Sequence, residues 1–230
     1  MLFSGPAGAV QLSLCQGHFE AVRGPSYSYQ LQQGDTAVPA ELASDLELSA
    51  RAIYDSWESL LAARPPFVVG INLRVMSDAA EFQALKSELA PDLPDVTGFY
   101  AWEGNLAVAL HQPGAAHQTR RRALHEISHV VTASQTGAAP HWLAEGLAEF
   151  HEMITPQDDR LVVMPNERHR RHLGSGQLPA LETFFAQPAE AWYREDSQQL
   201  YGIAWSLVYF LMQSPQGRGA LGYTLQQSST

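Results

Sequence analysis

The chain has 230 residues, of which 45% are hydrophobic and 17% are charged, and this composition indicates a folded protein with a packed core. Its formal charge of −10 comes from 14 basic and 24 acidic residues, so we expect no nucleic acid partner. The single cysteine, Cys15, excludes an internal disulfide and a cysteine-rich zinc site.

Hydrophobic periodicity predicts one continuous domain over residues 1–230, with an α/β portion at 1–115 and a helical portion at 116–230. No apolar run approaches the roughly 20 residues that cross a bilayer, so we expect no membrane span. The pattern predicts, in chain order, a strand at 10–22, a helix at 38–63, a strand at 67–76, a helix at 79–89 and two short strands at 99–102 and 105–110.

An HExxH motif occupies residues 125–129, inside a predicted helix at 119–134. His125 and His129 are four residues apart, which places them about 40° apart around a helix and one turn apart along it. Both imidazoles can therefore bind one metal ion. Glu126 lies beside that face, where it can take a proton from a water molecule that the metal activates. We predict two metal ligands and a general base.

Apolar residues flank this motif and indicate a helix that packs in a core. Leu124, Ile127, Val130 and Val131 form a stripe next to the two histidines. A helix on a solvated surface would not show this stripe. The alternative interpretation is a pair of histidines at the edge of the core, each hydrogen-bonded to the backbone.

A second helix is predicted to begin after Pro140, and it carries Glu145 and Glu149 four residues apart on one face. Burying two carboxylates without a cation is costly, and a bound dication would relieve that cost. A catalytic zinc site typically needs a third protein ligand beside the two histidines. The apolar neighbours on this helix are Trp142, Leu143, Leu147, Ala148 and Phe150.

The stretch from His125 to Glu149 resembles the gluzincins, and most closely the bacterial peptidase-MA-like domains of unknown function. The resemblance implies an α+β, zincin-like fold, in which a small twisted sheet packs on the HExxH helix. It also implies that Glu145, 16 positions after His129, is the third zinc ligand. Glu149 matches an acid that orients a zinc-bound histidine from behind.

Residues 201–211 resemble the helix that follows the active site in aminopeptidase-like gluzincins. The resemblance implies that Tyr201 donates a hydrogen bond to the tetrahedral intermediate and stabilises its charge. Ala204 stands where that family usually has a glycine, and the alternative for Tyr201 is a tyrosine of the core. The resemblance and the segment Ala7-Gly8-Ala9, which looks like a signal-peptidase site, favour a soluble periplasmic or secreted protein over a cytoplasmic one.

Other metal ligands fit the sequence less well. The metzincin pattern needs glycine and histidine where this chain has Thr132 and Gln135. His141 or His151 could replace Glu145 as the third ligand. We expect instead that His141 lies at the start of the helix and that His151 lies on a solvated face of it.

The sequence thus predicts a zinc metallopeptidase that hydrolyses a peptide or protein substrate. The alternative is a catalytically inactive zincin-fold module that binds or scaffolds. We expect the strand at 105–110 to be the edge that pairs with an extended peptide, and Glu103-Gly104 to form a hairpin turn. The basic clusters at 120–122 and 168–172 are expected to be solvated faces paired with acids, or anchors for an acidic group of the substrate.

Overall fold

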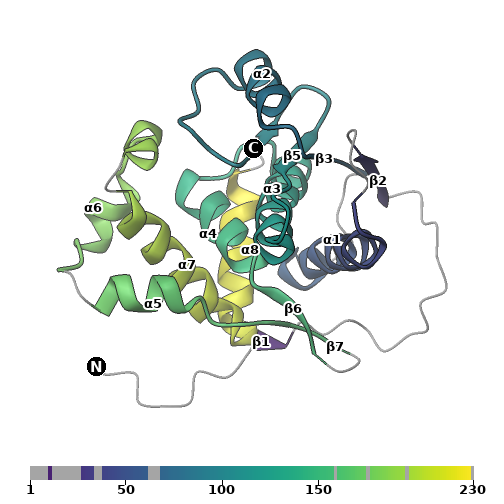
Figure 1. Cartoon of the computed structure of the whole chain (residues 1–230). Helices are drawn as coiled ribbons and strands as arrows, with labels where there is room; N and C mark the ends of the chain where they lie inside the picture. The colour runs from purple at the N-terminus through teal and green to yellow at the C-terminus, as the bar shows by residue number, and fades with distance from the viewer. Residues whose placement is uncertain are drawn as a thin grey trace.

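The computed structural model describes residues 10–11, 27–33, 38–61, 68–157, 160–174, 177–194 and 197–228. In chain order they form β1 (Val10–Gln11), β2 (Tyr27–Gln33), α1 (Ala40–Leu61), β3 (Val69–Met76), α2 (Ala79–Leu89), β4 (Gly98–Ala101), β5 (Leu106–Leu110), α3 (Ala116–Thr136), α4 (His141–His151), β6 (Ile154–Gln157), β7 (Arg160–Val163), α5 (Glu167–Gly174), α6 (Leu181–Phe185), the 3-10 helix η1 (Ala189–Tyr193), α7 (Gln198–Met212) and α8 (Pro215–Ser228). Figure 1 shows α3 and α4 in the middle of the molecule, with α5, α6 and α7 on one side and α1 and β2 on the other.

The main sheet has the strand order β2-β3-β5-β4, in which β2, β3 and β5 run parallel and β4 runs antiparallel to β5. The helix α2 lies between β3 and β5 in the chain, as the predicted strand, helix, strand unit requires. The Asp78 side chain caps α2 by accepting from the backbone N–H groups of Ala80 and Glu81. The predicted helices at 38–63, 79–89 and 119–134 are confirmed, with ends shifted by a few residues.

The edge of the main sheet differs from the prediction. The strand at 105–110 corresponds to β5, which pairs with β3 on one side and β4 on the other, so it has no unpaired edge. The edge strands are β2 and β4, and β4 is the one next to β5. The order of strands in a sheet is set by tertiary packing, and the local apolar pattern does not encode it.

The turn at Glu103-Gly104 is confirmed as the connection between β4 and β5. Gly104 and Asn105 both have positive φ, 78° and 50°, which tight turns require. The Asn105 side chain donates to the Gly70 carbonyl and to Ser134 Oγ, each at 3.0 Å, and accepts from the Tyr100 hydroxyl at 3.0 Å. One side chain therefore ties the hairpin to β3 and to α3.

The core lies between the main sheet and α3, and it continues to α1, α4, α7 and α8. The apolar stripe of α3 is fully buried together with Ile71 and Leu73 of β3 and with Ala107 of β5. Beyond it, α4 packs closely on α7, because a Cβ on Gly146 would come within 2.8 Å of the Ala204 carbonyl oxygen. The glycine after Glu145 and the small residue at 204 allow this approach.

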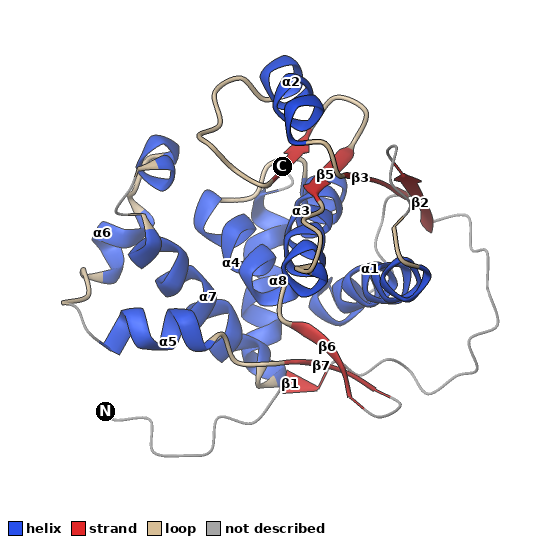
Figure 2. Cartoon of the chain, in the orientation of Figure 1, coloured by secondary structure: helices blue, strands red, loops and turns tan. Residues whose placement is uncertain are grey.

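The second half of the chain is mainly helical, as predicted for residues 116–230, but it also contains two strands. The strands β6 and β7 form an antiparallel pair, which β1 extends to a three-stranded sheet (Figure 2). Val10 and Gln11 are the only described residues of the strand predicted at 10–22, and the rest of that segment lies outside the described residues. The fold is a mixture of helices and small sheets, as the predicted α+β class requires. Within the described ranges, no helix has both the length and the apolar character to cross a membrane.

Two glycines of α8 give a test of this packing. A Cβ on Gly222 would overlap the Leu60 carbonyl oxygen of α1, whereas a Cβ on Gly219 would meet nothing within 4 Å. We expect Gly222→Ala to lower the free energy of unfolding by about 1–3 kcal/mol. Gly219→Ala should leave it unchanged or raise it by up to about 1 kcal/mol, because alanine is the better helix former. Urea unfolding of both variants measures this, and equal stabilities would contradict the close contact of α8 with α1.

Candidate metal centre

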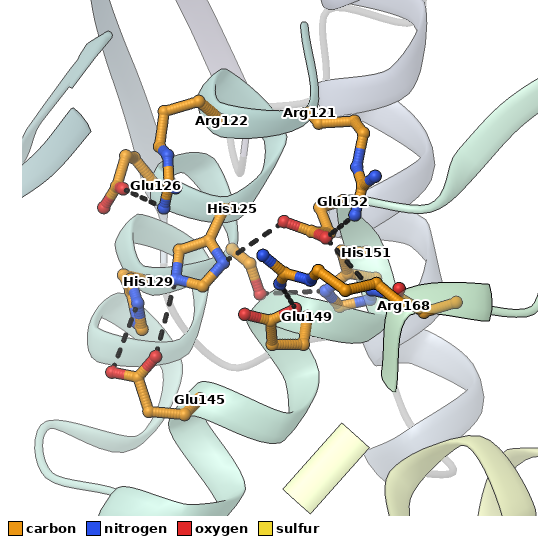
Figure 3. Close-up of polar contacts among 12 residues, drawn as sticks. Arg121, Arg122, His125, Glu126, His129, Glu145, Glu149, His151, Glu152 and Arg168 are labelled. Atoms are coloured by element: carbon orange, nitrogen blue, oxygen red, sulfur yellow. Dashed lines mark hydrogen bonds and ion pairs between the residues drawn. The ribbon is translucent and has the colours of Figure 1, made fainter. Parts of the chain in front are cut away.

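Two adjacent helices bring together the three residues that the sequence predicts as metal ligands. His125 and His129 lie one turn apart on α3, and Glu145 faces them from α4 (Figure 3). His125 Nε2 is 3.4 Å from Glu145 Oε2, and His129 Nε2 is 3.6 Å from Glu145 Oε1. One donor atom from each residue lies within 4.8 Å of the other two.

These spacings fit a tetrahedral zinc ion. Bonds of about 2.0–2.1 Å from a shared zinc place two ligand atoms about 3.4 Å apart. The observed separations of 3.4 and 3.6 Å are close to that value and long for direct hydrogen bonds, and they run to the two different oxygens of the Glu145 carboxylate. Two imidazoles and one carboxylate are also the donors that catalytic zinc prefers. The residues present therefore fit a zinc ion.

The electrostatics of this site favour a cation between the side chains. Burial alone would lower the pKa of His125, but the carboxylates of Glu145 and Glu152 outweigh burial and raise that pKa well above its ordinary value. Burial lowers the pKa of His129 to about 4. Burial would raise the pKa of Glu145, yet His129 and His125 lower it to about 2. The Glu145 carboxylate is thus ionised and His129 is neutral at pH 7, while the acids favour a proton on His125 that a metal ion bound there would displace.

Glu126 lies beside the ligands without belonging to them. Its side chain is only 6% exposed, and burial raises its pKa to about 7, although His125 and Arg122 act in the opposite direction. Arg122 Nη1 is 3.9 Å from Glu126 Oε1. A buried carboxyl group with a pKa near neutrality can both take and return a proton at pH 7, which is the property of a general base.

A second layer of acids lies behind His125, on the side away from Glu145. His125 Nδ1 has no hydrogen-bond partner within the described residues, and Glu152 Oε2 lies 3.7 Å from it. Glu152 forms an ion pair with Arg121 and accepts from Asn166 Nδ2 at 3.2 Å. The acid that faces His125 Nδ1 in the structure is therefore Glu152, just after α4.

Glu149, which the resemblance places behind a histidine ligand, has closer partners on α5. Its Oε2 lies 2.6 Å from His169 Nε2 and 3.4 Å from Arg168 Nη2. Donor atoms of His125, Glu149 and Glu152 also lie within 4.8 Å of one another. Because Glu149 and Glu152 each have a basic partner, these two acids are compensated without a second ion.

Glu152 was not predicted as a site residue, whereas Arg121 and His169 belong to the basic clusters that were predicted to pair with acids, as both do here. Glu152 is seven residues after Glu145, so helical periodicity places it on the same face as Glu145 and Glu149. That spacing could have identified it. The pairing of Glu149 with His169 joins α4 to α5, and no local pattern indicates this contact.

The two alternative ligands differ in position. His141 Nε2 lies 3.7 Å from Glu145 Oε1, at the start of α4, so it borders the metal centre. His151 is fully buried and contacts Ser128 Oγ at 2.9 Å and Ser56 Oγ at 3.2 Å. The expected solvated position of His151 is wrong, because α1 and α3 cover this end of α4.

Tyr201 lies on α7 and lines the same cleft as the metal centre. Its ring packs against the edge of Trp192, with ring centroids 5.4 Å apart. Burial raises the pKa of Tyr201 above its ordinary value, and the charge of Glu145 raises it further. The phenol thus keeps its proton at pH 7 and remains a hydrogen-bond donor.

The cleft has a volume of about 570 Å³ and opens onto the three ligands and Glu126. Its walls come from the segment before β4 and β4 itself, from α3 and α4, from the start of α5, and from residues in 192–194 and 197–201. A search of protein-family models and a search of curated protein sequences find no match to this chain. The function is therefore inferred from the geometry of this site.

The buried imidazole of His151 predicts a dependence of stability on pH. Burial lowers its pKa from 6.5 to about 3, so the unfolded chain binds more protons than the folded one between these values. Stability from this group is complete above pH 6.5 and is lost as the pH falls toward 3, by at most roughly 1 kcal/mol per pH unit. We expect His151→Gln to remove this contribution.

Urea unfolding at pH 7.5, 6.0 and 5.0, with a chelator present, measures the effect. The difference in unfolding free energy between wild type and His151→Gln should be constant above pH 6.5 and should shrink below it. A difference that stays constant down to pH 5.0 would show that His151 does not titrate in this way.

Proposed function

We propose that this chain is a zinc-dependent peptide hydrolase of the gluzincin type, with a zincin-like fold. The observation that carries the proposal is the convergence of His125, His129 and Glu145 at the spacing of zinc ligands, with Glu126 buried beside them. Three protein ligands leave a fourth coordination position for water or substrate. Zinc bound there supplies Lewis acidity, which polarises the scissile carbonyl and makes water more acidic.

Glu126 acts as the general base. Its carboxylate takes a proton from the attacking water as the water oxygen bonds to the carbonyl carbon. When the C–N bond breaks, the same carboxyl group returns the proton to the leaving amine. The pKa of about 7 suits both steps, since the group exchanges protons readily near neutrality.

Two further features support a peptide as the substrate. Tyr201 keeps its phenol proton and can donate it in a hydrogen bond to the carbonyl oxygen, where negative charge develops. The edge strand β4 lines the cleft with Gly98, Phe99 and Tyr100. An extended peptide can pair with such an edge through its backbone. The peptide strand would then cross the site above Glu126.

The resemblance to the gluzincins also supports a location outside the cytoplasm, in the periplasm or secreted. A catalytically inactive zincin-fold module is the other function that this fold would serve. The buried Glu126, with a pKa tuned to about 7, favours the hydrolase, because a binding module has no need of a general base.

Mutation of the proposed ligand Glu145 and of the proposed base Glu126 should affect different properties, zinc binding for the first and peptidase activity for the second. Glu126→Gln is expected to keep one zinc per chain while peptidase activity falls by about 10²–10⁴, the usual contribution of a general base. Glu145→Gln should weaken zinc binding itself. Elemental analysis of both purified variants and cleavage of a mixed peptide library measure these effects.

Loss of zinc from Glu126→Gln together with full zinc affinity in Glu145→Gln would reverse the two assignments. A wild-type protein that holds zinc and cleaves nothing in a broad library would support the inactive module instead.

The structure places Glu152 next to His125 Nδ1, whereas the resemblance implies that Glu149 is the acid that orients a histidine ligand. The zinc affinity of variants at the two positions can distinguish these assignments. We expect Glu152→Gln to lower zinc affinity by about 10–100-fold, because its carboxylate faces His125 Nδ1. Glu149→Gln should have a smaller effect, since its carboxylate binds His169.

A chromophoric chelator in competition gives both dissociation constants, and melting temperatures of the zinc-free variants control for damage to the fold. A larger loss of affinity in Glu149→Gln would support the assignment that the resemblance implies.

A further inference from the structure

The charges that line the cleft, apart from the metal centre, are mostly positive. The three ligands, Glu126 and the pair of Glu149 with His169 already have roles in the site. Arg168 is paired with Glu149, so the charged side chains that remain in the lining are Asp95, Arg122 and Arg194. Asp95 accepts a hydrogen bond from Gln83 Nε2 at 3.1 Å. Two further arginines in the cleft of a chain with a charge of −10 favour an anionic ligand.

Arg122 is the arginine closest to the general base, and it differs from its two neighbours in the chain. Arg120 binds Asp45 and the Ile154 carbonyl, and Arg121 binds Glu152. Within the described part of the chain, the Arg122 guanidinium makes no hydrogen bond, and its nearest acid, Glu126, is 3.9 Å away. Of these three consecutive arginines, only Arg122 keeps its donors available to a ligand.

The position of Arg122 is fixed by the strand β4. A Cβ on Gly98 would overlap Cγ and Cδ of Arg122, so the arginine stem lies directly across the glycine backbone. The side chain is 37% exposed, and its guanidinium opens into the cleft. A stem that is held in place loses little further entropy when the guanidinium binds a ligand.

We propose that Arg122 binds a carboxylate of the peptide substrate, either its C-terminus or the side chain of an acidic residue near the scissile bond. This inference rests on the proposed hydrolase function. The planar guanidinium offers two parallel N–H donors that match a carboxylate. Arg122 is one helical turn before Glu126, and an extended chain advances about 3.3–3.6 Å per residue. The carboxylate therefore lies within one or two residues of the bond that is cleaved.

Matched peptides test this proposal. Each cleaved sequence is made with a free C-terminus and with a C-terminal amide, and with Asp or Asn next to the scissile bond. In one of the two pairs, wild type is expected to cleave the carboxylate form with a kcat/KM at least about 10-fold higher than that of the neutral form. A hydrogen bond between charged groups contributes a free energy of this size. The pair that shows the preference identifies the source of the carboxylate.

Arg122→Gln should abolish this preference by slowing cleavage of the carboxylate form more than cleavage of the neutral form. Because Arg122 lies next to Glu126, any effect on the general base slows both forms alike, and the ratio of the two rates within the variant isolates the carboxylate contact. Arg194→Gln removes another arginine of the same cleft and should keep the preference. Efficient cleavage by wild type with no preference in either pair would overturn the role of Arg122 while leaving the hydrolase intact. So would a preference that survives in Arg122→Gln.

If wild type cleaves no peptide, the hydrolase proposal fails, and binding decides the role of Arg122 separately. The same peptide pairs are then titrated into zinc-loaded wild type and Arg122→Gln by calorimetry. Tighter binding of a carboxylate form by wild type alone supports the carboxylate site. Equal binding of all forms overturns it.

Discussion

The structure depends on the burial of ionisable groups between α3 and α4. His125, His129 and Glu145 meet on one side, and Glu149 and Glu152 lie behind them; His129 is partly buried and the other four are buried. Buried charges are stable only when opposite charges or a metal ion compensate them. Arg121, Arg168 and His169 provide that compensation for the rear acids. The front carboxylate has histidines for partners, and this is the group that we propose as a metal site.

The surrounding elements keep these groups in position. Gly146 lets α7 approach α4, which brings Tyr201 into the same cleft as Glu145. Gly98 lets β4 approach α3, which fixes Arg122 next to Glu126. At both points a Cβ on the glycine would overlap atoms of the neighbouring helix, α7 for Gly146 and α3 for Gly98. The site is therefore assembled from two close approaches as well as from its polar residues.

Local patterns predicted the elements well, because each depends on nearby residues. The helices α1, α2 and α3 and the β4–β5 turn follow from periodicity, from the Asp78 cap and from Gly104. The HExxH spacing likewise predicted that His125 and His129 share a face. Contacts distant in sequence were not predictable in this way. The burial of His151 depends on Ser56, 95 residues away, and the place of β5 inside the sheet depends on β3.

The edge strand β4 has only four residues, and β5 occupies one of its sides. Successive residues of a strand direct their backbone hydrogen-bonding groups to alternate sides, so about two residues of β4 face outward. A short edge of this kind protects the protein against pairing with other copies of itself. It also offers a peptide few backbone contacts, so most of the selectivity of this cleft has to come from side chains on its walls.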